Sequence, residues 1–235
     1  MKKDIPLKER IIFPLDVDSE SKAKDWVKRL ESHIGFFKVG LQLFLSSWFH
    51  IVDWIIDRGH KVMLDLKLYD IPQTVESAIK EISKRPIAFT TVHGDREILK
   101  AAAGKKENVK VLAVTVLTSL SPNDLKELGY SMDLKELVIK RAQDALNSGC
   151  DGVVCSGLEV EEVRKKTKED FIIIVPGVRP YGEKKDDQKR VVDVRTAFEK
   201  GADFVVVGRP IKNSKDPIKT VEDMQKEILD VLKIK

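Results

Sequence analysis

Two acids and a lysine stand close together in the run D-L-K-L-Y-D-I-P, which occupies residues 65–72. The apolar residues before it, 61–64, are typical of a buried strand. Side chains alternate along a strand, so Asp65 and Lys67 are predicted to point to the same face. Charges are seldom buried unless they are paired or functional. We therefore expect an ion pair at the end of this strand, with Asp70 just beyond it.

The elements that position these charges can be read from apolar runs that recur along the whole chain. The runs are short, rich in β-branched residues and almost continuously apolar, as strands covered on both faces should be. They comprise residues 11–16, 36–39, 62–65, 88–92, 111–116, 152–155, 171–175 and 204–207. Amphipathic stretches between them, such as 20–31 and 134–148, indicate helices. Ser121 followed by Pro122 is typical of a helix start.

Eight strands alternating with helices predict parallel βα units. A closed (β/α)8 TIM barrel fits eight such units better than an open doubly wound sheet, which is the alternative fold. With 235 residues and no recognisable linker or repeat, residues 1–235 are expected to form a single domain. The longest connection, residues 176–190, is rich in glycine, proline and charge, and a loop of this length is usually functional or disordered.

Polar residues follow the predicted strands, and the carboxyl ends of barrel strands meet at one mouth. They include Asp16, Lys38, Asp65, Lys67, His93, Thr118, Cys155, Ser156, Arg179, Gly208 and Arg209. Four of them have a simpler structural explanation. Asp16 and Ser156 could cap helices, Lys38 could be a surface lysine, and His93 fits a structural histidine better than a ligand.

The pair Gly208-Arg209 follows the eighth strand, where barrels often bind phosphate. Glycine lets backbone N–H groups approach an anion, and a guanidinium group forks onto phosphate oxygens. Arg179 and Gln188, in the long loop, could supply further donors. We therefore expect a phosphate site at this end of the mouth.

Composition describes a globular protein, with 42% hydrophobic and 34% charged residues. A net charge of +4 does not indicate nucleic acid binding. No run reaches the ~18 apolar residues of a membrane span, and no signal segment is visible, so the cytoplasm is expected. Cys150 and Cys155 are expected to be reduced core residues. Dinucleotide, P-loop, zinc and nucleophile-elbow motifs are absent, so the site must work with acids, lysines, arginine and backbone.

The run at residues 65–72 resembles the D-x-K-x-x-D-I-P signature of the orotidine 5′-phosphate decarboxylase family. Further segments of that family's pattern follow in order between residues 16 and 210. They are L-D at 15–16, F-K-V-G at 37–40, T-V-L-T-S at 115–119, P-G-V-R-P at 176–180, D-Q at 187–188 and V-G-R-P at 207–210. The resemblance implies a carboxy-lyase that makes uridine 5′-monophosphate in the final step of de novo pyrimidine synthesis, without metal or cofactor.

The resemblance also implies a role for each matching residue. Asp16 and Lys38 would contact the ribose, and Asp65 and Lys67 would flank the reacting carbon. Thr118 would hydrogen-bond the pyrimidine. The phosphate would be held by Arg179, Gln188, Gly208 and Arg209. The family forms homodimers with shared sites, so Asp70, Ile71 and Thr74 would reach the partner's site.

Loss of CO₂ from C6 of the pyrimidine leaves a carbanion in the ring plane, with no π system to delocalise it. A lysine ammonium group can stabilise that charge and then donate the proton, and this role falls to Lys67. Repulsion between an aspartate and the departing carboxylate would be secondary. Binding of the distant phosphate would close the loop at 176–190 over the site.

Three alternatives stay open. A keto-sugar-phosphate decarboxylase or hexulose-phosphate synthase would share the barrel and the D-x-K-x-x-D core, but these resemble each other in using Mg²⁺ and a glutamate where this chain has Lys38. A phosphate-ligand binding protein on the same scaffold would not need Lys67 between two acids. A purely structural charge cluster would not explain Gly208 and Arg209.

Overall fold

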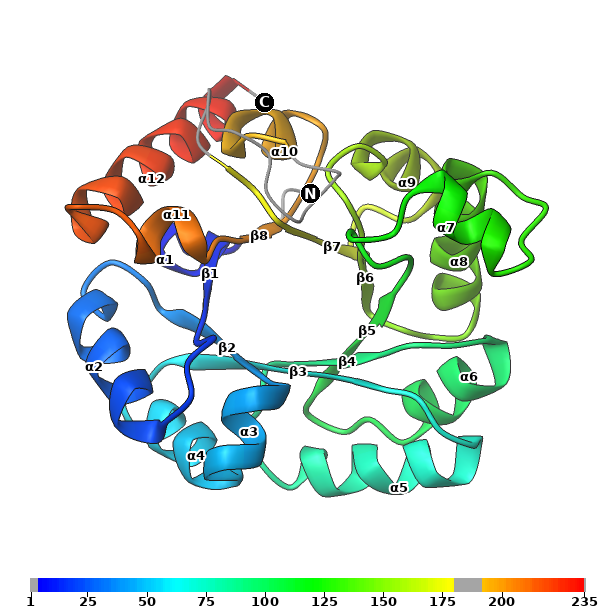
Figure 1. Cartoon of the computed structure of the whole chain (residues 1–235), viewed down its shortest axis with the longest axis horizontal. Helices are drawn as coiled ribbons and strands as arrows, with labels where there is room; N and C mark the ends of the chain where they lie inside the picture. The colour runs from blue at the N-terminus through cyan, green and yellow to red at the C-terminus, as the bar shows by residue number, and fades with distance from the viewer. Residues whose placement is uncertain (1–3, 180–191, 235) are drawn as a thin grey trace.

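A computed structural model of the chain describes residues 4–179 and 192–234, and within them eight parallel strands close into a barrel (Figure 1). The strands follow one another around the barrel in sequence order, and β1 (Ile11–Pro14) pairs with β8 (Phe204–Val206) to complete it. The other strands are β2 (Phe36–Gly40), β3 (Lys61–Leu68), β4 (Phe89–Val92), β5 (Lys110–Val114), β6 (Gly152–Val154) and β7 (Ile172–Pro176). The predicted (β/α)8 barrel is confirmed, and the open sheet is excluded.

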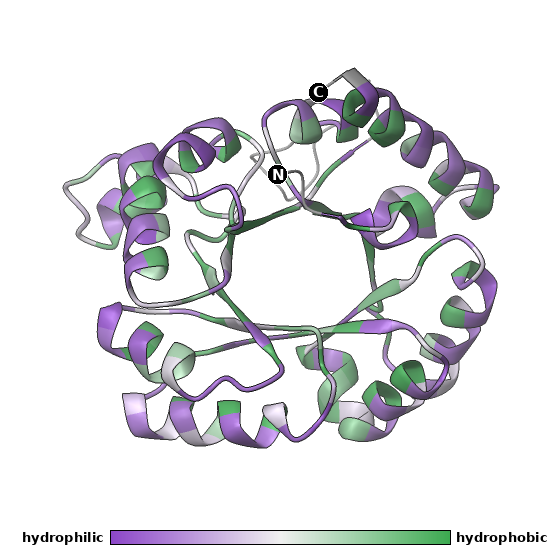
Figure 2. Ribbon diagram, turned by 180° about the vertical axis from the view of Figure 1, so that it is seen from behind, coloured by the Kyte–Doolittle hydropathy of each residue, from purple (hydrophilic) through white to green (hydrophobic). Residues whose placement is uncertain are grey.

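Helices surround the barrel and turn their apolar sides toward it (Figures 1 and 2). They are α1 (Leu7–Arg10), α2 (Glu20–Leu30), α3 (Leu41–Ser47), α4 (Phe49–Asp57), α5 (Pro72–Ser83), α6 (Arg96–Gly104), α7 (Pro122–Glu127), α8 (Leu134–Asn147), α9 (Val160–Lys166), α10 (Val194–Glu199), α11 (Arg209–Lys212) and α12 (Pro217–Ile234). In the described ranges, no helix combines the length and apolarity needed to cross a membrane.

The predicted boundaries fall within three residues of the observed ones. The helices expected at 20–31 and 134–148 end one residue earlier, because Glu31 and Ser148 are their C-caps. Ser121 and Pro122 do begin a helix: the Ser121 hydroxyl accepts from the backbone N–H of Asp124, and the Asp124 carboxylate accepts from the N–H of Ser121. The larger difference is β3, which continues to Leu68 instead of ending at Asp65.

The barrel interior at the amino-terminal ends of the strands is filled by aromatic side chains. Phe36, Phe89 and Phe204 come from three different strands, and their ring centroids lie 5.0 to 5.8 Å apart. All three are at most 5% exposed. A filled lumen leaves the carboxyl ends of the strands as the open end of the barrel.

A second and larger core lies between the strands and the helices. Cys150 and Cys155 are buried, are not disulfide-bonded and belong to this core, which confirms their expected structural role. Burial raises the pKa of the Cys150 thiol to about 12. The thiol is therefore inert near neutral pH.

Candidate active site

A cavity of about 510 Å³ opens at the carboxyl ends of the strands, and most of the residues predicted for the site line it. The predicted residues in its wall are Asp16, Lys38, Asp65, Lys67, Thr118, Arg179, Gly208 and Arg209. They come from segments that follow β1, β5, β7 and β8 and from β2 and β3 themselves. The barrel brings together residues almost 200 positions apart in the sequence.

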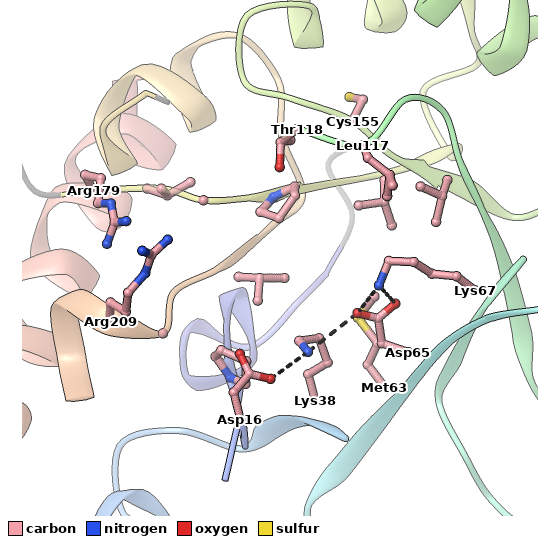
Figure 3. Close-up of a pocket in the computed structure, with 18 of the residues that line it drawn as sticks. Asp16, Lys38, Met63, Asp65, Lys67, Leu117, Thr118, Cys155, Arg179 and Arg209 are labelled. Carbon is pink, nitrogen blue, oxygen red and sulfur yellow. Dashed lines mark hydrogen bonds and ion pairs between the residues drawn. The ribbon is translucent and has the colours of Figure 1, made fainter. Parts of the chain in front are cut away.

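Carboxylate and ammonium groups alternate along one wall of the cavity (Figure 3). The Lys38 Nζ lies 3.2 Å from Oδ1 of Asp16 and 3.5 Å from Oδ2 of Asp65. The Lys67 Nζ lies 2.9 Å from each Asp65 oxygen. The side chains of Lys38 and Asp65 are 12% and 11% exposed, whereas that of Lys67 is 35% exposed. Lys67 is therefore the more accessible of the two ammonium groups that contact Asp65.

Asp65 is the centre of this array. Burial by itself would raise the pKa of its carboxyl group, but the charges of Lys38 and Lys67 and hydrogen bonds from Lys67 and Thr91 outweigh burial. The net effect is a lowered pKa, so Asp65 is a carboxylate at neutral pH. A fixed negative charge between two lysines keeps both ammonium groups at this wall.

Two arginines stand at the other end of the cavity (Figure 3). Arg179 follows β7 and is 7% exposed, and Arg209 begins α11 directly after β8. Gly208 lies between β8 and Arg209, and a Cβ there would lie 2.8 Å from Cγ of Pro14. A side chain at position 208 would therefore push apart the ends of β1 and β8. The arrangement provides guanidinium groups where sequence analysis expected a phosphate.

Some predicted residues lie outside this cavity. Asp70 and Ile71 are exposed in the turn from β3 into α5, and Thr74 is exposed in the first turn of α5. Oδ1 of Asp70 accepts a hydrogen bond from the N–H of Ile71 at 2.7 Å. Among the described residues, Lys67 forms its ion pair with Asp65 and none with Asp70, although the sequence places it between these two acids. Gln188 and most of the loop at 176–190 lie outside the described residues.

His93 lines a neighbouring pocket and not the main cavity. Its ring packs edge-on against Tyr69, with centroids 5.8 Å apart. Burial, followed by the charges of Arg141 and Lys67, lowers the pKa of His93. His93 therefore lies outside the main cavity, and its interpretation as a structural residue stays a prediction.

Sequence reasoning missed Thr91, whose hydroxyl group donates a hydrogen bond to Asp65 at 2.9 Å. It also missed Met63 and Val116 in the cavity wall, whereas Cys155 lies there as its position after a strand indicated. The only signal at Thr91 is a polar residue inside an apolar strand, which threonine's ordinary preference for strands explains equally well.

A closed barrel of parallel strands with charged side chains at their carboxyl ends defines the class of (β/α)8-barrel enzymes. Residues 9–224 match the family described as Orotidine 5′-phosphate decarboxylase / HUMPS family. The chain belongs to this family, so the expected membership is confirmed.

Relatives with known names agree over nearly the full length. The chain is 48% identical to the orotidine 5′-phosphate decarboxylase of Methylococcus capsulatus, covering 97% of this chain and 96% of the relative. It is 40% identical to that of Stenotrophomonas maltophilia, covering 97% of each. A crystal structure of the decarboxylase from Lactobacillus acidophilus superposes with a TM-score of 0.82 at 34% identity, covering 94% of this chain and 99% of that one. The expected enzyme class, a carboxy-lyase, is confirmed by these relatives.

Proposed function

We propose that this chain decarboxylates orotidine 5′-monophosphate to uridine 5′-monophosphate without a metal or cofactor. The names of its relatives support the overall reaction. The observation that carries the mechanism is the position of the Lys67 ammonium group, held 2.9 Å from both oxygens of Asp65 at one end of the cavity. The arginine pair lies at the other end (Figure 3).

The chemical step breaks the bond between C6 of the pyrimidine and its carboxylate. CO₂ leaves, and the electron pair stays on C6. The Lys67 ammonium group stabilises this pair by its charge and then transfers a proton to C6, which gives the product. Asp65 keeps the ammonium group in place, and Lys38 neutralises part of the Asp65 charge.

The remaining wall residues bind the rest of the nucleotide. Arg179 and Arg209 hold the phosphate, with Gly208 and Gln188 contributing to the same end. Asp16 and Lys38 contact the ribose, and Thr118 hydrogen-bonds the base. The separation of the two arginines from Lys67 supports this orientation of the nucleotide, with its phosphate at the arginines and its base at Lys67. Phosphate binding energy then serves to position C6 beside Lys67.

The charge pattern supports a metal-free reaction. Among the described residues, Asp16 and Asp65 are the carboxylates of this wall, and the Lys38 ammonium group stands between them at 3.2 and 3.5 Å. A divalent cation at the same carboxylates would be repelled by Lys38. This separates the proposal from a Mg²⁺-dependent reaction on the same barrel.

A homodimer is part of the proposal, and the surface around the mouth supports it. Large apolar side chains are exposed in the segments that follow β2, β3, β5 and β6: Leu41, Leu45, Trp48, Tyr69, Ile71, Leu117, Leu128, Tyr130 and Leu158. A neighbouring pocket lined by Lys67, Arg96 and Arg141 lies on the same face. Large apolar side chains exposed in several neighbouring segments are a feature of interfaces. Asp70, Ile71 and Thr74 of a second copy would enter there.

The test is a turnover assay with orotidine 5′-monophosphate, following the loss of orotidine absorbance in excess EDTA. We expect full activity with the chelator and no gain from added Mg²⁺. Parallel titration with uridine 5′-monophosphate distinguishes an enzyme from a binding protein. Binding of the nucleotide without turnover, or activity that EDTA abolishes, would contradict the proposal.

A further inference from the structure

The strand that carries Lys67 is irregular at the catalytic residues. Leu64 pairs with Thr90 and Leu68 pairs with Val92, so three residues of β3 face the single residue Thr91 of β4. Such a bulge leaves backbone groups of the longer strand without their ladder partners. Its geometry therefore depends on what replaces those partners.

Lys67 itself has a φ of +50°. This left-handed conformation is uncommon for a residue with a side chain, and such residues persist where the surroundings hold them. Because a regular strand would have φ near −120°, the direction of the Lys67 side chain depends on this local conformation. The contacts that hold residue 67 thus also aim its ammonium group.

One buried hydroxyl group both replaces a ladder partner of Lys67 and helps to fix the direction of its side chain. The Thr91 Oγ1 accepts a hydrogen bond from the Lys67 backbone N–H at 2.9 Å and donates its own proton to Oδ1 of Asp65, also at 2.9 Å. Thr91 is 0% exposed, so water does not compete for these bonds. The single proton of a hydroxyl group fits this pair of partners without conflict.

We propose that Thr91 is a positioning residue, which fixes the bulge at Lys67 and the Asp65 carboxylate at the same time and so places the ammonium group at the reacting carbon. This role presupposes the proposed function. It gives Thr91 no contact with substrate, since it acts through Lys67 and Asp65.

The neighbouring residue offers a matched control. Thr90 is also 0% exposed, and its hydroxyl group donates to the backbone carbonyl of Leu64 at 3.2 Å. Adjacent side chains on a strand point to opposite faces, so Thr90 points away from the side of Asp65. Thr91→Val and Thr90→Val each remove one buried hydroxyl group of the same size, but only the first removes contacts to the site.

The experiment compares Thr91→Val, Thr91→Ser and Thr90→Val by steady-state kinetics, affinity for uridine 5′-monophosphate and thermal unfolding. Thr91→Val should lower kcat on the order of 10- to 100-fold, because small displacements of a catalytic group are costly. Its affinity for the nucleotide should change less than about twofold, because the arginine end is distant from Thr91 and untouched. Thr91→Ser should recover most of kcat, and Thr90→Val should keep kcat. Should Thr91→Val fail to fold, Thr91→Cys, with a much weaker donor and acceptor, takes its place.

A second readout does not depend on turnover. The charged groups that face Asp65 are Lys38 from β2 and Lys67 from β3, and both are retained in every variant. An NMR titration of the Asp65 carboxyl carbon should therefore show a higher pKa in Thr91→Val and an unchanged one in Thr91→Ser. If the unsubstituted protein fails to decarboxylate, the proposed function falls, while this titration still decides whether Thr91 holds Asp65.

Two results would overturn the role of Thr91. One is a Thr91→Val protein with normal kcat and an unshifted Asp65 titration. The other is an equal loss of kcat in Thr90→Val, which would mean that both substitutions act by destabilising the fold and not through the site.

Discussion

The ammonium nitrogen of Lys67 lies at the same distance, 2.9 Å, from both carboxylate oxygens of Asp65. This symmetric contact joins a largely buried acid to a lysine that is still 35% exposed to the cavity. Asp65 thus anchors the ammonium group without enclosing it. One face of the lysine is left for a substrate, which is what charge stabilisation followed by proton transfer requires.

Replacing the ammonium group should therefore stop the reaction. We expect Lys67→Ala to lower kcat by more than ~10³-fold, since it removes both the charge and the proton donor. Binding of uridine 5′-monophosphate, measured by calorimetry, should persist because the arginine end is intact. Near-normal turnover would show that Lys67 has no catalytic role.

A lysine at the opposite end of the same strand provides the control for this substitution. Lys61 begins β3 and forms an exposed ion pair with Glu9 at 2.6 Å. Lys61→Ala should leave kcat unchanged, because exposed ion pairs contribute little and this one is remote from the mouth.

At the arginine end, Arg209→Ala should lower kcat/KM by about 10²- to 10³-fold, because the remote phosphate interaction is used in the transition state. Soluble guanidinium ion should restore part of the activity by filling the vacated space. Arg195→Ala, which changes a surface arginine of α10, should neither lower kcat/KM nor respond to guanidinium. Retained kcat/KM in Arg209→Ala, with no response to guanidinium, would count against a phosphate site here.

Much of this architecture could be predicted because each strand has a local apolar pattern, and the regular alternation of strands with helices implies the barrel. All eight strands were found from β-branched runs, and their order placed Asp16 and Arg209 at one mouth although they are far apart in sequence. The bulge at Lys67 could not be predicted, because it depends on the Thr91 side chain across the sheet and on no pattern within residues 61–68. Cross-strand contacts of this kind have no signal in a single sequence.

Stability in acid should depend on Asp65. The pKa of this carboxyl group is lower in the folded protein than its ordinary value, so the unfolded chain takes up the proton more readily as pH falls. The contribution of Asp65 to the free energy of unfolding is present above the ordinary carboxyl pKa of about 4. It is lost as pH falls from there through the lower folded-state value.

Urea unfolding at a series of pH values tests this. Asp65→Asn should make the free energy of unfolding fall less steeply below about pH 4 than in the unsubstituted protein. Asp57→Asn removes an exposed carboxylate at the end of α4 and should leave the slope unchanged. Equal slopes for the protein with and without Asp65 would mean that its charge is not stabilised by the fold.

Sharing of sites between subunits can be tested by complementation. Asp70 is exposed and lies outside the cavity of its own chain, so under the proposed dimer it serves the partner's site. Lys67→Ala and Asp70→Ala proteins, each impaired alone, should regain activity when co-expressed. Random pairing makes half of the dimers mixed, and each mixed dimer has one intact site of two, so about a quarter of full activity is expected.

Co-expression of Lys67→Ala with Asp65→Ala is the matched control. Both residues line the cavity of the same subunit, so every site in a mixed dimer lacks one of them and activity should stay low. Recovery in the Asp70 combination alone identifies a residue contributed across the interface. Equal recovery in both combinations, or none in either, would exclude a shared site, because only a residue supplied by the partner can separate the two mixtures.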